Sequence, residues 1–194
     1  MKFLIALLAL TSLSAFAVAT GEQAPDFTLS GTKEVKLSDL KGKVVVLEWM
    51  NHGCPFVRKH YDSGNMQALQ KKYTSQGIVW LSIISSAPGK QGHVDAKGAA
   101  LEKEKNKSFA TEVLLDPTGK VGNLYGAKTT PHMFVIDKTG KLAYQGAIDD
   151  HADADKESIP ASKNFVAAAL DEVMSGKPVT RHTTKSYGCS VKYE

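Results

Sequence analysis

The sequence contains little cysteine: two of its 194 residues, Cys54 and Cys189. Val57 stands three residues after Cys54, so the chain has no Cys-x-x-Cys pair. Cys54 therefore lacks a neighbouring thiol that would resolve a mixed disulfide formed on it. A domain of this length needs no disulfide for stability, so we expect any bridge between the two cysteines to be redox-active rather than structural.

Other common signatures are also missing. Acidic and basic residues are interleaved, as in "LEKEKNK" at 101–107, and the net charge is only +4, which argues against a nucleic-acid-binding surface. No glycine-rich phosphate motif occurs, and the acidic segment "DDHADADKE" at 149–157 lacks the glycine and spacing of a calcium loop. The chain shows no internal repeat. We therefore predict no cofactor, no bound metal and no nucleic-acid partner.

The first nineteen residues differ in composition from the rest of the chain. A lysine precedes an apolar run over residues 3–17, and the small residues at 17–19 fit a cleavage site after Ala19. The run is short for a membrane span and no stop-transfer pattern follows, although an uncleaved N-terminal anchor is the alternative. We predict a signal peptide over 1–19 and an exported protein, periplasmic or secreted, without stable membrane insertion after cleavage.

Hydrophobic patterning predicts alternating strands and helices in the mature chain. Buried strands are expected at 44–50 and 78–85, because both runs are apolar and rich in β-branched residues. A helix between them, broken near Gly64, is expected at 55–73. The remaining expected elements are a helix at 96–108, a hairpin turning at 138–141 and a helix at 161–176 ended by Gly176. This order predicts an α/β domain over 20–178, followed by a tail over 179–194 that carries Cys189.

Three segments carry a resemblance to a known family: "APDFTLS…VKLSDLKGKVVVLEW", "CPFVRKHY" and "LLDPTGKVGNLYGAKTTPHMFVIDKTGKLAYQGAID". With these segments, which span most of residues 21–150, the chain resembles the thioredoxin-like superfamily. Within it, the chain is similar to the redoxin branch of exported TlpA-like and AhpC/TSA peroxiredoxin-like proteins. The resemblance implies a thioredoxin-like fold, with a central mixed sheet flanked by helices, and a thiol–disulfide oxidoreductase activity.

Cys54 is expected at the start of a helix, in the stretch "NHGCPF". Unpaired backbone N–H groups and the positive end of the helix dipole favour the thiolate there, and Pro55 suits the first helical turn. Basic side chains nearby either add to this positive field or face water: His52, Arg58, Lys59 and His60. We predict that Cys54 is the attacking thiol.

The resemblance implies three further site residues. Pro131 corresponds to the proline that thioredoxin folds hold in the cis form, with the backbone of Thr130 facing the thiol and free to pair with a substrate chain. Glu48 corresponds to a buried acid that exchanges a proton during the reaction, and burial would raise its pKa. The alternative for Glu48 is a position at the sheet edge in contact with solvent.

The chain also departs from its family in ways that leave alternatives open. Asn51 stands where peroxiredoxins carry threonine or serine, and Cys54 aligns with the first cysteine of Cys-x-x-Cys rather than with the peroxidatic one. We expect Cys189 to fold back and resolve Cys54; a mixed disulfide with a partner protein is the alternative. The expected partners are protein or small-molecule disulfides, or peroxides, together with an electron donor. A thiol peroxidase (antioxidant) and a copper-binding protein are the other candidate functions.

The composition of the N-terminus yields a first testable prediction. Protein recovered from the envelope fraction of an exporting host should begin at Thr20, because cleavage after Ala19 removes the apolar run. Intact mass spectrometry measures this directly. Recovery of the full-length chain, or of a cytosolic pool alone, would remove the argument for export.

Overall fold

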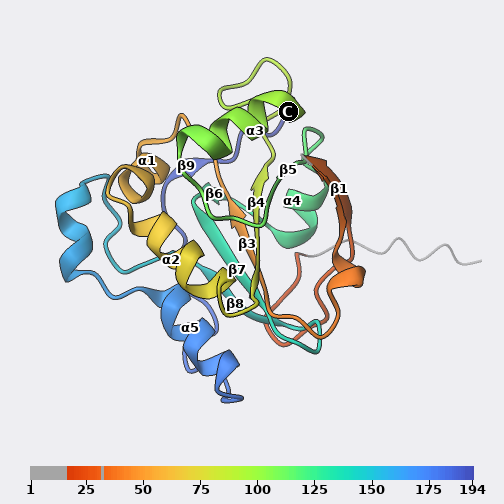
Figure 1. The fold of residues 1–194 in the computed structure, drawn as a ribbon, viewed down its shortest axis with the longest axis vertical. Coiled ribbons are helices and arrows are strands. Elements are labelled where there is room, and N and C mark those ends of the chain that lie inside the picture. Colours follow the sequence, from red (N-terminus) through yellow and green to blue (C-terminus); the bar gives the residue numbers. More distant parts are fainter. Residues whose placement is uncertain (1–16, 32) are drawn as a thin grey trace, which may run out of the picture.

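A seven-stranded mixed sheet forms the centre of the protein in a computed structural model that describes residues 17–31 and 33–194 (Figure 1). The sheet order is β2-β1-β5-β4-β3-β7-β8. Strands β3, β4 and β5 are parallel, and the other pairings are antiparallel. The strand bounds are β1 Thr28–Gly31, β2 Glu34–Lys36, β3 Val45–Trp49, β4 Val79–Ile84, β5 Glu112–Leu115, β7 His132–Ile136 and β8 Leu142–Gly146. This arrangement confirms the predicted α/β class with a central mixed sheet.

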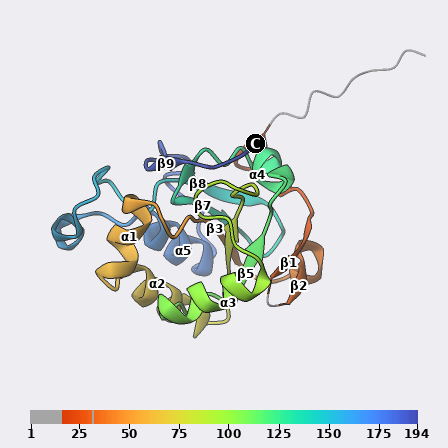
Figure 2. The same ribbon diagram turned by 90° about the horizontal axis from the view of Figure 1, so that it is seen from above.

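Helices cover both faces of the sheet (Figure 2). One face carries α1 (Pro55–Asp62), α2 (Asn65–Thr74), α3 (Ala96–Lys105) and α5 (Phe165–Met174). The other face carries α4 (Lys120–Tyr125), the short 3₁₀ helix η1 (Leu37–Leu40) and the N-terminal segment. A second 3₁₀ helix, η2 (Lys156–Ala161), precedes α5. The parallel strands require such crossovers, because a parallel pair cannot be joined by a tight turn.

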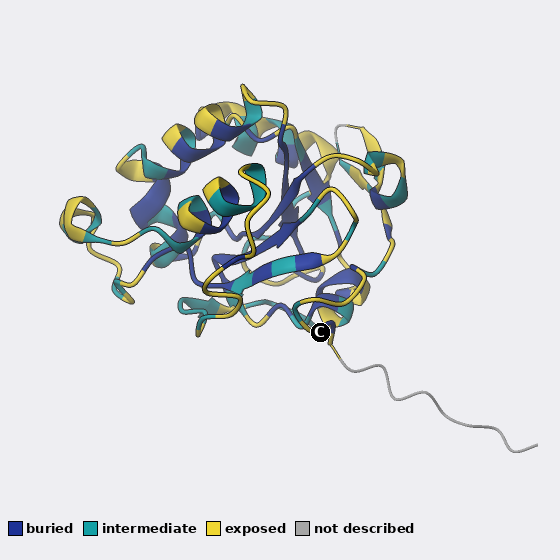
Figure 3. Cartoon of the chain, turned by 90° about the horizontal axis from the view of Figure 1, so that it is seen from below, coloured by how far each residue is buried: buried dark blue, intermediate teal, exposed yellow. Residues whose placement is uncertain are grey.

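The central strands are buried on both sides, which explains their continuous apolar sequences (Figure 3). Alternate side chains of β3 enter different cores: Val46 packs under α1 and α2, whereas Leu47 and Trp49 pack toward α4. Glu48 lies on the same side as Val46. The strand alternation therefore places a carboxyl group in the apolar layer beneath α1.

Most predicted elements agree with the structure. The break expected near Gly64 in the helix at 55–73 is confirmed, because Ser63 ends α1 and Gly64 takes a left-handed φ of 79° before α2. One difference has a local cause. The helix expected at 161–176 begins only at Phe165. Its N-cap is Asn164, whose side chain accepts a hydrogen bond from the Ala167 N–H. The Thr130–Pro131 peptide bond is cis, as predicted.

The segment over 179–194 lies along the domain instead of extending from it. Its strand β9 (Cys189–Ser190) pairs antiparallel with β6 (Thr129–Thr130), which ends at the cis-proline. Further along, the Ala87 N–H donates to the Lys192 carbonyl. Backbone hydrogen bonds thus attach this segment, which we call the C-terminal strap, to two loops at one end of the sheet.

The N-terminal boundary of the domain lies close to α4. Residues 1–16 of the predicted signal peptide lie outside the described residues. Val18 is buried on the α4 side of the sheet, and its N–H donates to the Leu124 carbonyl. No helix among residues 17–31 and 33–194 has the length and apolar character needed to cross a membrane.

Candidate active site

Cys54 is the N-cap residue of α1 and directly precedes Pro55 at the first helical position. A tight turn leads into it: the Asn51 side-chain oxygen accepts the Gly53 N–H, and the Asn51 carbonyl accepts the Cys54 N–H. The Cys54 side chain is fully buried. The strand–turn–helix geometry therefore directs the thiol toward the free N–H groups of the first helical turn, as the sequence predicted.

The C-terminal strap brings Cys189 against Cys54. The two Sγ atoms lie 2.7 Å apart, and both cysteines are free thiols. In the β6–β9 ladder Cys189 is the register partner of Thr130, whose carbonyl oxygen lies 3.1 Å from the Cys54 sulfur. A disulfide bond measures about 2.05 Å, so the two thiols are close enough to be joined without a large backbone movement.

Gly188 is the residue that permits this approach. Its φ of 120° lies in the region that favours glycine, and an added Cβ would lie 2.1 Å from the Thr130 carbonyl oxygen. The same Cβ would come within 3.4 Å of Phe56 on α1. Any larger residue at this position would push β9, and with it the Cys189 thiol, away from Cys54.

The two thiols differ in acidity. Burial by itself raises the pKa of Cys54, but hydrogen bonds from the Cys189 thiol, the Thr130 side chain and the Val57 N–H lower it to below its usual range. Burial and the adjacent Cys54 sulfur raise the pKa of Cys189 to about 11. Cys54 is therefore the better nucleophile of the pair, and Cys189 is the hydrogen-bond donor to its thiolate.

The expected positive field from nearby basic residues is smaller than the sequence suggested. Burial lowers the pKa of His60 to about 4, so its imidazole is neutral at physiological pH. Arg58 forms an ion pair with Asp62 one turn along α1. Lys59 is buried and pairs with Asp153 at 3.0 Å. The stabilisation of the Cys54 thiolate consequently depends on hydrogen bonds more than on free cations.

Glu48 is fully buried on an interior strand, so the alternative of a solvent-exposed edge position is wrong. Its carboxylate accepts hydrogen bonds from four side chains: Tyr61, Gln70, Trp80 and Ser82, at 2.8–3.1 Å. Burial raises the pKa of Glu48, and these hydrogen bonds oppose the rise without cancelling it. A carboxyl group with a raised pKa beneath the active helix can hold and release a proton at higher pH than an exposed glutamate.

Thr130 and Pro131 lie beside the thiol as predicted, but their backbone is not free. The edge of β6, where the resemblance implies that a substrate chain pairs, is occupied by β9 of the same molecule. The Cys54 thiol is therefore covered by the C-terminal strap.

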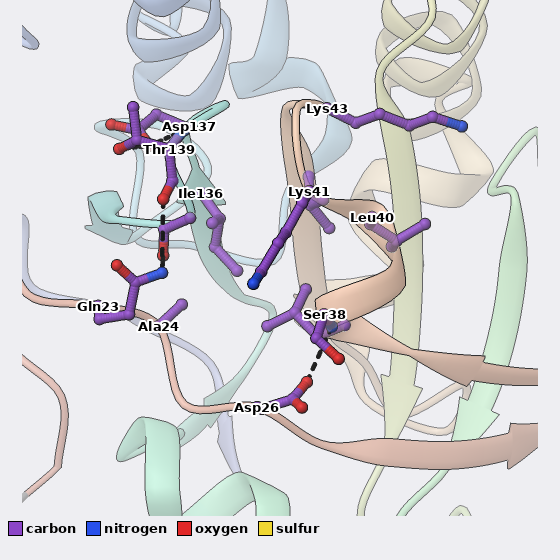
Figure 4. Close-up of a pocket in the computed structure, with 13 residues that line it drawn as sticks. Gln23, Ala24, Asp26, Ser38, Leu40, Lys41, Lys43, Ile136, Asp137 and Thr139 are labelled. Atoms are coloured by element: carbon purple, nitrogen blue, oxygen red, sulfur yellow. Dashed lines mark hydrogen bonds between the residues drawn. The ribbon is translucent and has the colours of Figure 1, made fainter.

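A cavity of about 580 Å³ lies at the opposite end of the sheet (Figure 4). It is bordered by Val45 at the start of β3 and Ile136 at the end of β7, whereas Cys54 follows the end of β3. Lys41 extends into this cavity, and Gln23 is held by the carbonyls of Thr139 and Gly140. Neither cysteine lines it, so the two cysteines and this cavity are separate features.

The described residues contain no group of three or more His, Cys, Asp and Glu side chains arranged to hold a metal ion. The described part of the chain thus offers a copper ion no site of this kind.

Residues 20–145 match the AhpC/TSA family, which is more than half of the chain. The chain belongs to this family. A similar curated protein is the thiol-disulfide oxidoreductase ResA of Geobacillus thermodenitrificans, 31% identical over 129 residues that cover 65% of this chain and 68% of ResA. The family and the redoxin resemblance predicted from the sequence are confirmed.

Solved structures confirm the thioredoxin-like fold. A protein assigned as the thiol:disulfide interchange protein DsbE of Chlorobium tepidum is 33% identical, with a TM-score of 0.54, and the match covers 79% of this chain and 99% of that one. A hypothetical protein of Sinorhizobium meliloti has a TM-score of 0.77 at 23% identity, covering 92% of this chain and 97% of the other. The second likeness extends over nearly the whole of both chains and shows the fold alone.

Sequence reasoning missed two groups of residues around the cysteines. The four donors to Glu48 come from α1, α2 and β4. Only Ser82 carried a signal, because it is a polar residue inside the apolar run at 78–85. Tyr187 and Asp149, which hydrogen-bond to each other at 2.5 Å near α1, were also missed. They are 38 residues apart, and no local pattern marks such a pair.

The hydrogen bond from Cys189 predicts a difference between two variants. In Cys189→Ser the hydroxyl still donates to the Cys54 thiolate, so the pKa of Cys54 should stay below the free-cysteine value of about 8.5. In Cys189→Ala the donor is gone and the pKa of Cys54 should be higher than in Cys189→Ser. The pH dependence of the alkylation rate reports both values. Equal pKa values in the two variants would contradict the role of the donor.

The raised pKa of Glu48 predicts how stability depends on pH. The folded state retains a proton on Glu48 that the unfolded state releases above the ordinary pKa of 4.5. Its contribution to stability is therefore fully present below pH 4.5 and is lost as the pH rises through the folded pKa. The free energy of unfolding of the wild type, minus that of Glu48→Gln, should fall as the pH rises above 4.5 and through the raised pKa of the folded state. Urea unfolding of the two reduced proteins at a series of pH values measures this difference. A difference that does not change with pH would contradict a raised pKa for Glu48.

Proposed function

We propose that this protein is a thiol–disulfide oxidoreductase in which Cys54 attacks and Cys189 resolves. The observation that carries the proposal is the 2.7 Å separation of their sulfur atoms across the β6–β9 ladder. Family membership and the similarity to ResA support the reaction class. The depressed pKa of Cys54 and the raised pKa of Cys189 support the division of roles.

The reaction reduces a substrate disulfide and oxidises the protein. The Cys54 thiolate attacks one sulfur of the substrate, forms a mixed disulfide and releases the other sulfur as a thiolate. Cys189 then loses its proton and attacks the Cys54 sulfur. This step forms the Cys54–Cys189 disulfide and releases the second substrate sulfur, which accepts the proton. Two electrons pass to the substrate, and an external dithiol donor must return them to the protein.

Glu48 is proposed as the proton reservoir for these steps. Its carboxyl group is buried in the layer directly under α1, where Tyr61 of that helix donates to it at 2.9 Å. The raised pKa keeps its proton available closer to neutral pH than that of an exposed carboxyl. No hydrogen bond among the described residues joins Glu48 to Cys54, so the transfer would require an intervening group such as water.

The position of β9 supports a substrate pathway that begins with displacement of the C-terminal strap. Cys54 is completely covered while β9 occupies the β6 edge. A substrate chain that pairs with Thr130 must replace β9 there, and the return of β9 after the first attack brings Cys189 to the mixed disulfide. The same edge would thus bind the substrate and the resolving cysteine in succession.

We further propose that the enzyme works after export, as a mature domain over 20–178 with its strap over 179–194. The apolar N-terminal segment supports this. Export would also suit a Cys54–Cys189 couple, because disulfides persist in oxidising compartments. The peroxidase alternative is less well supported, because Asn51 uses its side chain on the Gly53 N–H and the Gln91 carbonyl. With both ends engaged in this way, the Asn51 side chain does not point toward a peroxide bound at Cys54.

The proposed roles predict different products for two cysteine variants. Reduced Cys189→Ser treated with glutathione disulfide should accumulate a stable Cys54–glutathione adduct, because no thiol resolves it. Under the same conditions the wild type should proceed to the intramolecular disulfide, and Cys54→Ser should not react at an appreciable rate. Intact mass and non-reducing peptide mapping identify the products.

Turnover assays distinguish the alternatives. The wild type should reduce insulin disulfides with a dithiol donor, and both variants should lose this turnover. Two free thiols in the wild type after mild oxidation would mean that Cys54 works alone or with another protein. Rapid consumption of hydrogen peroxide without insulin reduction would favour the peroxidase.

A further inference from the structure

Tyr187 anchors the C-terminal strap two residues before Cys189. Its hydroxyl donates to Asp149 Oδ1 at 2.5 Å and lies 3.1 Å from His60 Nε2. Its ring packs against Phe56, with ring centroids 6.0 Å apart, and Lys59 Nζ lies 5.8 Å from the ring centroid. Three of these contacts are to α1, the helix that begins at Cys54.

The directions of these hydrogen bonds follow from the number of protons. Tyr187 has one hydroxyl proton, and the short contact to a carboxylate takes it. The neutral His60 must therefore carry its proton on Nε2 and donate it to the tyrosine oxygen. His60 Nδ1 is then an acceptor, which agrees with the Asn65 side-chain amide nitrogen at 2.9 Å. The result is a directed chain from His60 through Tyr187 to Asp149.

Asp149 depends on this chain for its hydrogen bonding. It is 1% exposed, and its backbone is fixed by a bridge to Asn164. Oδ1 accepts the Tyr187 hydroxyl and the His151 N–H, whereas Oδ2 is buried without a hydrogen-bond partner among the described residues. A buried carboxylate is costly when it lacks hydrogen-bond donors, and Asp149 has few. The position in which Tyr187 donates to Asp149 is therefore strongly favoured.

The ladder that holds Cys189 is short. β9 pairs with β6 through two residue pairs, Thr129 with Ser190 and Thr130 with Cys189. Only Gly188 separates Tyr187 from Cys189, and two residues span at most about 7 Å. A docked Tyr187 therefore restricts the Cys189 thiol to the immediate surroundings of Cys54, which raises its effective concentration there.

We infer that Tyr187, held by Asp149 and His60, is the positioning residue that delivers Cys189 to Cys54 and so sets the equilibrium between the dithiol and the disulfide. This inference rests on the proposed function. Tyr187 itself touches neither sulfur; it acts by fixing the strap on α1, and the electrons and protons move as in the two-step exchange described above.

The test compares Tyr187→Phe with Tyr193→Phe, which makes the same chemical change elsewhere in the strap. The Tyr193 hydroxyl donates at 2.8 Å to the neutral Ala127 carbonyl, and a hydrogen bond to a neutral group contributes less than one to a carboxylate. Equilibration with glutathione buffers gives the potential of each couple. Tyr187→Phe should weaken the intramolecular disulfide about tenfold, a shift of about 30 mV toward less negative potential. Tyr193→Phe should shift the potential clearly less than Tyr187→Phe does.

Kinetics separate positioning from a general structural defect. In Tyr187→Phe the first attack on glutathione disulfide should be as fast as in the wild type or faster, because a looser strap uncovers Cys54. The second step, resolution by Cys189, should be about tenfold slower. A structural defect of the site would slow both steps together, and that result would overturn the inference.

Asp149→Asn tests the same chain from the domain side. Each single variant should shift the potential of the Cys54–Cys189 couple. The double variant should shift it by less than the sum of the two single shifts, because both changes remove the same Tyr187–Asp149 hydrogen bond. Full additivity, or a Tyr187→Phe potential equal to that of the wild type, would overturn the positioning role while leaving the cysteine couple intact. A wild type that forms no intramolecular disulfide at any glutathione ratio would instead refute the proposed function.

Discussion

The pairing of β9 with β6 is the contact on which the redox site depends. It joins β9, which carries Cys189, to β6, whose Thr130 carbonyl lies beside the Cys54 sulfur. The pairing thus brings together two cysteines that are 135 residues apart in the sequence. Closing so long a loop has an entropic cost that a ladder of two residue pairs does not offset alone. Further contacts along the strap add to this ladder: Tyr187 on α1, the Val191 N–H on the Lys128 carbonyl, Tyr193 on the Ala127 carbonyl, and backbone hydrogen bonds that join Gln145 of β8 to His182 and Thr184.

Two buried carboxyl groups lie near α1, Glu48 on β3 and Asp149 in the segment after β8, and they differ in their hydrogen bonding. Glu48 lies under the helix with four side-chain donors, so its charge is well solvated by the protein even though burial raises its pKa. Asp149 lies on the strap side of α1, with one side-chain donor, Tyr187. The surroundings of Glu48 suit a group that exchanges a proton. Those of Asp149 suit a group that holds a docked segment in place.

A single tail cysteine in place of a neighbouring one also changes how the site is opened and closed. In a Cys-x-x-Cys site both thiols belong to one rigid helix start, whereas here the second thiol belongs to a strap that also covers the first. In the proposed mechanism, resolution and substrate access are coupled, because one movement of β9 would govern both. The close fit at Gly188 makes this docking specific, since no other residue type fits between Thr130 and Phe56 without displacement.

The sequence by itself determined the local features of this protein. The apolar runs at 44–50 and 78–85 define the buried strands, and "NHGCPF" defines a cysteine at a helix start. These features follow from neighbouring residues and their backbone preferences. The cis form of Pro131 in "KTTPHMF" was implied by the family resemblance, because local sequence alone favours a trans bond. The number of cysteines showed only that a pair was possible.

Only the tertiary structure decided what surrounds the thiols. The burial of Glu48, the neutral state of His60 and the partnership of Tyr187 with Asp149 depend on packing between segments far apart in the sequence. The positive field around Cys54 is weaker than expected, because Arg58 and Lys59 form ion pairs with acidic residues. No local pattern in the sequence indicated these pairs. Burial, charge and hydrogen bonding are properties of the assembled layers, and the sequence specifies them only through the complete fold.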